Sequence, residues 1–255
     1  MLHHIQTSVK ALIELILPSR CPSCGAIIKE CVDHGVGAFC SDCWADTQFI
    51  TKPWCATCAI PFEFESDEMP RQCGACMQNP PRHDGIRAAI VYGDISRSVI
   101  TKLKYGGRIA IAKLVAQHMM RFIDEDIASL GGDIWLVPVP LHWTRLLKRT
   151  YNQSALIADA LLEASNKTQF HHYPDVLRRI KKTPPLIGAD SKQRKQLLKN
   201  AIALDDKYKA SIRGRNIILV DDVYTSGATT DECVKILKAA GAETVLIYCW
   251  TRVIN

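Results

Sequence analysis

The sequence predicts an α/β protein, built as a parallel sheet with helices on both faces and preceded by a small zinc-ribbon module. Four C-x-x-C pairs predict the module, and all of them lie before residue 77. Further along the chain, short apolar runs alternate with helical patterns. The clearest run, residues 217–220, leads into two acids and a loop of small residues. Such alternation is typical of parallel sheets covered by helices.

Charge divides the 255 residues into two parts. Residues 1–84 carry a net charge of −4 and residues 85–255 carry +10, within a total of +6. The Pro80-Pro81 pair is a loop signal at this point. We therefore expect an N-terminal helix and a cysteine-rich double zinc ribbon in residues 1–82, and a second domain in residues 83–255. The basic balance of the second domain suits phosphate-bearing ligands.

The chain is not expected to insert into a membrane. No apolar run approaches the ~20 residues that a spanning helix needs. The apolar stretch at residues 11–17 contains Glu14 and is followed by Pro18, which favours an amphipathic helix over a signal peptide. Cysteine pairs in a cytoplasmic protein bind metal or do redox chemistry instead of forming structural disulfides, and we expect a cytoplasmic protein.

The cysteine pairs have the spacing of zinc ribbons. The first two pairs are separated by 15 residues and the last two by 14. Two C-x-x-C turns can close a tetrahedron of thiolates around zinc, and four thiolates leave no open position for catalysis. We expect one or two structural zinc ions, with sequential or interleaved pairing, although Cys31 and His34 could compete as ligands. The predicted ligands are Cys21, Cys24, Cys40, Cys43, Cys55, Cys58, Cys73 and Cys76.

A phosphate-binding loop is predicted near the C-terminus. Asp221 and Asp222 follow the apolar run, and residues 223–229 lead into a helical pattern that ends before Gly241. Ligands of open α/β sheets bind at the carboxyl ends of the strands, and amides at a helix N-terminus bind phosphate. The two acids are placed to accept the hydroxyls of a sugar attached to that phosphate.

Residues 217–229 resemble the phosphoribosyl-pyrophosphate (PRPP) signature of type I phosphoribosyltransferases, with Tyr224 in place of an aliphatic residue. The resemblance implies that Asp221 and Asp222 bind the ribose hydroxyls and that Mg²⁺ accompanies PRPP. In hypoxanthine-guanine members of this superfamily, an aspartate at the position of Thr225 serves as the base toward the purine, so purine salvage is not supported here. The 5′-phosphate loop implied by the resemblance is Thr225, Ser226, Gly227, Ala228 and Thr229.

The order of cysteine pairs and phosphoribosyltransferase domain resembles ComF-type proteins, also called the GntX family, over nearly the whole chain. The segment that begins Leu103-Lys104-Tyr105 matches this family. The resemblance implies a pyrophosphate loop at Pro140 and Leu141, with catalytic roles for Arg145 and Arg149 beside the acid pair. Thr150 replaces the family's glycine, and this change is expected to weaken pyrophosphate binding if glycine is needed for close backbone approach. A solvated helix face is the alternative for the two arginines.

Residues 178–199 form a basic strip with eight Lys/Arg and one acid. In the family this region is the hood over PRPP, and Leu186 here replaces a glutamine. Without the family, the strip is either a solvated surface or a site for nucleic-acid phosphates. The residues assigned to the hood or to DNA are Arg178, Arg179, Lys181, Lys182 and Arg194.

Three functions remain open from the sequence. The ComF resemblance implies a PRPP-binding protein that handles single-stranded DNA and DNA-uptake partners in natural transformation. An active phosphoribosyltransferase with an unknown acceptor is the second. A zinc-dependent adaptor with a vestigial PRPP site is the third, favoured by Thr150 and Leu186 and opposed by the intact Asp221-Asp222 pair.

Overall fold

The computed structural model describes residues 18–28, 38–63, 71–105, 110–165, 167–182 and 191–254. The predicted N-terminal helix, Cys31, His34 and Leu186 lie outside these residues, as do the side chains of several residues in 191–195, Arg194 among them. None of the helices in these ranges has both the length and the apolar character needed to cross a bilayer.

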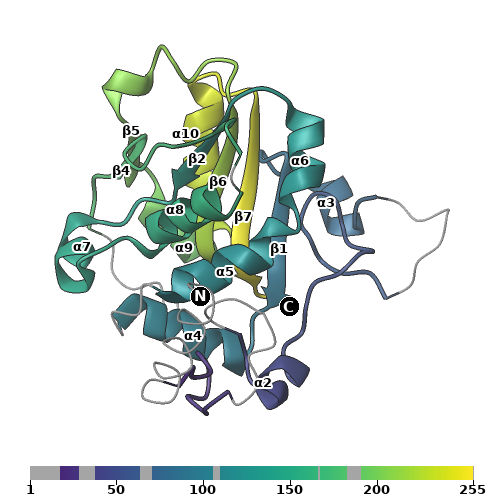
Figure 1. Ribbon diagram of the computed structural model, residues 1–255. Coiled ribbons are helices and arrows are strands. Elements are labelled where there is room, and N and C mark those ends of the chain that lie inside the picture. Colours follow the sequence, from purple (N-terminus) through teal and green to yellow (C-terminus); the bar gives the residue numbers. More distant parts are fainter. Residues whose placement is uncertain are drawn as a thin grey trace, which may run out of the picture.

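A five-stranded parallel sheet forms the centre of the molecule, in the strand order β1-β7-β6-β2-β3 (Figure 1). The central strands are almost wholly buried, which explains why they appear in the sequence as continuous apolar runs. The predicted fold class is confirmed. The strands are β1 (Gly85–Val91), β2 (Ile134–Pro138), β3 (Phe170–His172), β6 (Asn216–Tyr224) and β7 (Thr244–Arg252).

Helices cover both faces of this sheet. Ile218 and Val220 of β6 pack on the face covered by helices α5 and α8, whereas Ile217 and Leu219 pack on the face of α10. This alternation follows from the two-residue period of a strand. The helices of the domain are α4 (Asp94–Tyr105), α5 (Ala110–Met120), α6 (Ile123–Leu130), α7 (Trp143–Arg149), α8 (Gln153–Ser165), α9 (Ser191–Leu198) and α10 (Ala228–Ala239).

The predicted hood region begins as a separate two-stranded antiparallel sheet. It consists of β4 (Leu177–Arg179) and β5 (Ile202–Leu204), followed by the short 3-10 helix η1 (Asp206–Tyr208). Helix α9 packs against α10. The basic strip therefore lies beside the helix that follows the predicted phosphate loop.

The cysteine-rich module contacts both faces of the sheet around the edge strand β1. The Val91 N–H donates to Gln48 O (2.8 Å), and the Ile50 N–H donates to Ala89 O (3.0 Å). Residues around helix α2 (Ser41–Ala45) pack into the core on the α4–α5 side, whereas the segment ending in helix α3 (Gly74–Gln78) packs into the core on the α10 side. Both predicted units thus contribute side chains to the hydrophobic core on each face of the sheet.

The two acids lie at the C-terminal end of strand β6, as the sequence predicts. The strand continues past the apolar run 217–220 to Tyr224, and its pairing with β7 extends to Tyr224↔Arg252. Both acids are therefore fixed by the strand, three and two residues before its end.

Candidate functional site: two zinc centres and an acid pair beside a phosphate loop

Eight cysteines gather in two groups of four. Within each group the sulfur atoms all lie within 4.8 Å of one another. Cys24 Sγ lies 3.6 Å from Cys40 Sγ, and Cys58 Sγ lies 3.7 Å from Cys73 Sγ. Pairing is sequential, since the first two C-x-x-C pairs make one group and the last two make the other. Interleaved pairing is excluded.

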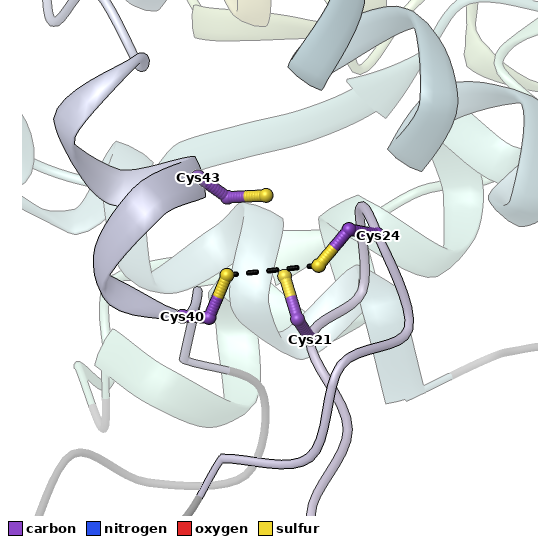
Figure 2. A group of neighbouring side chains, drawn as sticks. All are labelled: Cys21, Cys24, Cys40 and Cys43. Atoms are coloured by element: carbon purple, nitrogen blue, oxygen red, sulfur yellow. Dashed lines mark hydrogen bonds between the residues drawn. The ribbon is translucent and has the colours of Figure 1, made fainter.

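Both groups fit zinc. A tetrahedron with Zn–S bonds of about 2.3 Å has S–S edges of about 3.8 Å, close to the two distances above. Figure 2 shows how the first group forms: Cys21 and Cys24 come from a tight turn, and Cys40 and Cys43 flank the start of α2. Zinc held by four thiolates supplies structural cross-linking, because it has no vacant position for a substrate.

The first group is tied to helix α4 of the second domain. Lys102 Nζ donates to Pro22 O (2.9 Å), and Ser98 Oγ donates to Ser23 O (2.9 Å). Both acceptors lie in the turn that carries Cys21 and Cys24. The first zinc ribbon therefore positions the helix that also supplies Lys104 to the acid pair.

The acid pair is held by direct contacts on both carboxylates. Asp221 Oδ1 accepts hydrogen bonds from Ser154 Oγ (3.1 Å) and from the Asp222 N–H (2.9 Å). Asp222 is only 4% exposed, and its Oδ2 lies 2.5 Å from Lys104 Nζ. A buried carboxylate is tolerated when a cation pairs with it, which explains how Asp222 remains ionised.

The two carboxyl groups have opposite pKa shifts. Burial, followed by the charge of Asp222, raises the pKa of Asp221 to about 8. Burial acts in the same direction on Asp222, but the Lys104 ammonium outweighs it and holds the pKa of Asp222 below its usual value. At neutral pH the pair carries a single negative charge: Asp222 accepts hydrogen bonds, and Asp221 can also donate one.

The loop after β6 leaves polar groups ready for a ligand. Ser226 Oγ is buried and has no hydrogen-bond partner among the described residues. Gly227 is the N-cap of α10 with a φ of 73°, and no side chain caps the helix there. The N–H groups of the first helical turn are therefore available to an anion, together with the favourable end of the helix dipole.

Tyr224 packs directly onto this loop. A Cβ placed on Gly227 would come within 2.3 Å of Tyr224 Oη, so position 227 requires glycine for space as well as for its positive φ. The Arg252 guanidinium lies over the Tyr224 ring, 5.1 Å from its centroid. Burial raises the pKa of Tyr224 well above its usual range. The phenol is thus a neutral wall of the loop.

The acids and the loop line one cavity of about 610 Å³. Its basic lining residues are Arg97 and Lys104, both from α4. The cavity thus joins two carboxyl groups, two cations and a helix N-terminus. Its walls include Asp221, Asp222, Val223, Tyr224, Thr225, Ser226, Gly227, Ala228, Thr229 and Thr230.

The predicted pyrophosphate loop lies next to the acids, outside the walls of this cavity. Pro140 and Leu141 follow β2, which pairs with β6 up to Pro138↔Val220. Helix α7 begins after His142, whose Nδ1 accepts from the Thr144 N–H (3.3 Å). The Arg149 side chain donates to Tyr105 Oη (2.9 Å) and to Gln153 Oε1 (3.1 Å).

Arg149 acts on the acid pair through its charge, and it also acts on Arg145. Burial and the charge of Arg149 lower the pKa of Arg145. The charge of Arg149 also helps to lower the pKa of Asp222. This end of β2 is therefore electropositive, as an anion-binding loop requires, and the roles predicted for the two arginines stay predictions.

Thr150 occupies the C-cap of α7 with a φ of 66°. Glycine at this position of the family pattern is expected to permit close backbone approach. The structure gives a local reason instead: the position is left-handed, a conformation in which glycine is unstrained and a β-branched residue is not.

The predicted hood residues have different environments. Arg178 forms an ion pair with Asp205, whereas Lys181 and Lys182 are exposed. Arg179 is half-buried, and its pKa is lowered, first by burial and then by the charge of Arg145. Cys233 and Asp221 act in the opposite direction but do not outweigh these effects. Arg179 therefore lies close enough to Asp221, near the C-terminal end of β6, to feel its charge. The two lysines are exposed to solvent.

Comparison with known proteins identifies close likenesses for both parts. Residues 12–77 match the model of the double zinc ribbon domain. Competence protein F of Haemophilus influenzae is 27% identical over 211 residues, 82% of this chain and 88% of the relative. DNA utilization protein YhgH of Escherichia coli K12 is 28% identical over 220 residues, covering 86% and 92% of the two chains. Along most of its length the chain is thus similar to proteins named for competence and for DNA utilization.

The likeness extends to a second competence protein. Competence protein ComFC of Streptococcus pneumoniae is 24% identical over 243 residues, 91% of this chain and the whole of the relative. Among solved structures, hypoxanthine phosphoribosyltransferase from Trypanosoma cruzi in complex with IMP has a TM-score of 0.37, 12% identity, and coverage of 58% of this chain and 76% of the other. An allosteric regulatory enzyme of purine biosynthesis has a TM-score of 0.34, 16% identity, and coverage of 58% and 29%.

Sequence reasoning assigned no role to three residues of the site. Lys104 belongs to the segment that matches the ComF-type proteins, but nothing in the sequence says that it pairs with Asp222. Ser154, which donates to Asp221, lies 67 residues before its acceptor. Arg252 carries no motif at all. Each of these contacts is long-range, and a pattern of neighbouring residues cannot reveal it.

Proposed function

We propose that this ComF-type protein binds PRPP, or another phosphorylated ribose, in the cavity between α4 and the loop after β6, and that it takes part in handling single-stranded DNA during uptake. The observation that carries the first part is the buried, unpartnered Ser226 Oγ at the uncapped N-terminus of α10. A polar group in this state needs a ligand, because an unsatisfied buried hydroxyl is costly.

Each part of the ligand meets a matching group. The 5′-phosphate accepts hydrogen bonds from the amides and hydroxyls of residues 225–229, at the positive end of the α10 dipole. The ribose hydroxyls donate to the Asp222 carboxylate, and the protonated Asp221 donates to a ribose oxygen. Lys104 and Arg97 neutralise charge on the same side of the cavity.

Mg²⁺ would arrive with the ligand. Among the described residues, the side-chain groups with metal-binding geometry are the two cysteine groups, and the acid pair already engages Lys104 and Ser154. Pyrophosphate and ribose oxygens would therefore supply most ligands of the ion, as is usual for Mg²⁺ with phosphates. When bound, the ion supplies charge neutralisation for the pyrophosphate.

Calorimetric titration of PRPP with Mg²⁺ into the zinc-loaded chain tests this proposal. The Asp221→Asn/Asp222→Asn double variant should lose binding, whereas Asp206→Asn, an exposed acid on η1, should bind as the wild type does. Ribose 5-phosphate and pyrophosphate, titrated separately, distinguish the loop after β6 from the loop after β2. Absence of PRPP binding by a folded, zinc-loaded wild type would overturn the proposal and favour the adaptor function.

The role in DNA handling rests on the relatives' names and on the basic strip. Lys181 and Lys182 are exposed in this strip, and the charge of Lys182 helps to lower the pKa of His142, which precedes α7. We expect single-stranded DNA to bind with an affinity that falls steeply with salt. Alanine at both lysines should reduce the slope of log K against log[salt] by about 1–2. Alanine at Lys52 and Lys113, exposed lysines elsewhere on the chain, should leave the slope unchanged.

An active phosphoribosyltransferase is the second candidate. The observation that favours it is the pair Arg145 and Arg149, whose charges lie at the end of β2 beside the acid pair. Cations there stabilise a departing pyrophosphate. Release of pyrophosphate from PRPP, dependent on an added acceptor and lost in Arg149→Met, would establish this activity. Binding of PRPP without such release would limit the site to a regulatory ligand.

A further inference from the structure

Helix α7 turns its apolar face outward. Trp143, Leu146 and Leu147 have the i, i+3, i+4 spacing that puts side chains on one face of a helix, and they are 62%, 40% and 73% exposed. Arg145 and Arg149 are half-buried, and no residue of this helix is fully buried. A surface helix normally does the reverse, packing its apolar stripe on the core. An exposed apolar face of this kind marks a place where something binds.

Tyr105 extends this face beyond the end of α7. It is the last residue of α4 and is 71% exposed. Its hydroxyl accepts a hydrogen bond from the Arg149 side chain (2.9 Å), and the Arg149 guanidinium lies over its ring, 4.8 Å from the centroid. The ring is therefore held in position although most of it is open to solvent. A ring held in this way loses little entropy when a flat ligand stacks on it.

The two exposed rings lie at opposite ends of one ridge of the helix. Trp143, Leu146 and Arg149 follow one another at intervals of three residues, so they run along the helix over about 9 Å. Arg149 in turn holds Tyr105. The ridge thus has an indole at one end, a phenol at the other and a leucine between them. Figure 1 shows α7 at the margin of the molecule, where an extended ligand can reach it.

Positive charge surrounds this ridge. Helix α7 contains Arg145, Lys148 and Arg149 and no acid, and Lys148 is exposed. At the start of the helix, burial lowers the pKa of His142, and the charges of nearby cations, Lys182 of the basic strip among them, add to this effect. Exposed aromatic rings among cations suit a single-stranded nucleic acid, because its bases stack on the rings and its phosphates pair with the cations.

A protein partner fits this surface less well. Its apolar side chains come from one helix of seven residues and a single tyrosine, whereas a stable protein interface uses about 20–30 residues a side. The centre of a protein interface is also depleted in charged residues, and cations flank this ridge along its length. A few nucleotides of a single strand need no more surface than the ridge provides.

We propose that the outward ridge of α7 binds the bases of single-stranded DNA, which stack on Trp143 and Tyr105, while Lys148 and Arg149 supply positive charge to its phosphates. This inference rests on the DNA-handling part of the proposed function and adds to it a site for the bases. It does not depend on whether PRPP binds in the cavity beside the acid pair. Because every base has a flat face, binding at this ridge tolerates many sequences.

Binding of fluorescein-labelled oligo(dT) to the full-length, zinc-loaded chain, followed by fluorescence anisotropy, tests the proposal. Trp143→Leu should weaken binding about 5- to 150-fold, the range for loss of one stacked base. It should leave the slope of log K against log[salt] unchanged, because it removes no charge. Lys148→Ala should instead reduce that slope by about 0.7, the value for one phosphate of a single strand.

Two outcomes of this titration distinguish the inference from the function on which it rests. Equal affinities of the wild type and Trp143→Leu for oligo(dT) would overturn the site on α7 and leave DNA handling in place. Absence of oligo(dT) binding by the folded wild type would overturn both. Trp143→Phe keeps a ring for stacking and should retain most of the affinity.

Trp44 provides the matched control. It is also exposed (54%), but its ring packs on Phe49 with the centroids 4.7 Å apart. It lies in α2 between Asp42 and Asp46, an acidic setting that repels a nucleic-acid backbone. Trp44→Leu should therefore bind oligo(dT) as the wild type does. If Trp44→Leu and Trp143→Leu weaken binding equally, the loss of any exposed tryptophan explains the effect and the proposal is wrong.

An abasic strand gives a readout that a purely structural role of Trp143 would not move. The wild type should bind an oligonucleotide of abasic sites at least as weakly as Trp143→Leu binds oligo(dT), and Trp143→Leu should bind the abasic strand no worse than the wild type does. Equal weakening by Trp143→Leu on both strands would contradict stacking. A second copy of the chain is the other occupant to test: a dimer in sedimentation that Trp143→Leu converts to a monomer would overturn the proposal.

Discussion

The Nζ of Lys104 lies 2.5 Å from Oδ2 of Asp222, and this contact sets the charge of the whole acid pair. Asp222 stays ionised because the ammonium is beside it, and its charge in turn helps to keep Asp221 protonated. An acid pair that holds one proton can both donate and accept hydrogen bonds. Helix α4 therefore takes part in the site although the recognisable motif lies more than a hundred residues away.

Replacing Lys104 by Met should destabilise the chain by about 2–4 kcal/mol, because it leaves Asp222 buried without a partner. The loss should shrink in acid, where the Asp222 of the variant, which has lost its ammonium partner, becomes protonated. Urea unfolding at pH 5 and pH 7.5 measures both effects. Lys113→Met removes an exposed ion pair with Glu163 and should cost less than about 1 kcal/mol. Equal losses for the two variants would contradict the role given to Lys104.

Asp221 should make stability fall with rising pH. Its folded-state pKa of about 8 lies above the ordinary value near 4, so between these pH values the folded chain holds a proton that the unfolded chain releases. The stabilisation that Asp221 gives by holding this proton is therefore fully present below about pH 4, and it is lost as the pH rises towards 8. Between pH 5 and pH 9, the free energy of unfolding of Asp221→Asn should rise relative to that of the wild type by more than about 1.4 kcal/mol. Asp206→Asn should show no such change across this range.

Gly227→Ala should be costly mainly because of Tyr224. The new Cβ would lie 2.3 Å from Tyr224 Oη, in addition to the strain of a φ of 73°. In the wild-type background, Gly227→Ala should lower the free energy of unfolding by about 3 kcal/mol. In the Tyr224→Leu background it should cost only the backbone strain, about 1–2 kcal/mol. A double-mutant cycle by chemical denaturation measures the difference. Additive effects would mean that the Tyr224 side chain can move away from the new Cβ at little cost and does not restrict the loop.

Thr150→Gly should stabilise the protein. The residue has a φ of 66° at the C-cap of α7, and relief of left-handed strain is expected to give about 1 kcal/mol. The same change at Thr101, inside α4, should cost about 1 kcal/mol. Thermal unfolding distinguishes the two. If Thr150→Gly instead tightens pyrophosphate binding without changing stability, close backbone approach is the correct explanation for the family's glycine.

The parts predicted from sequence are those encoded by local spacing. The C-x-x-C turns place each pair of thiols together, and their sequential grouping needs only a short connecting loop. The apolar run before Asp221 and the glycine at 227 encode β6 and the start of α10. In contrast, the continuation of β6 beyond the apolar run is not encoded by local preference, because Asp221 and Asp222 are poor strand formers. Pairing with β7 overrides that preference up to Tyr224.

The contacts that tune the site could not be predicted. Lys104, Ser154 and Arg252 reach their partners only through the packing of α4, α8 and β7 around β6. A motif specifies residues next to one another in the chain, whereas each of these side chains comes from a different element. The function of Tyr224 was likewise hidden, because its departure from the aliphatic pattern acquires meaning only from its contact with Gly227.

The hydrogen bonds from residues 48–50 to β1 have a consequence for handling the protein. Strand β1 pairs with β7 on one side, and on the other its backbone groups meet Gln48 and Ile50. A truncated chain that begins at residue 83 would lose this cover and present a bare strand edge beside apolar side chains. Such edges recruit strands from other molecules, so the isolated second domain should self-associate. The zinc ribbons then serve as an intramolecular shield against aggregation, whatever else they bind.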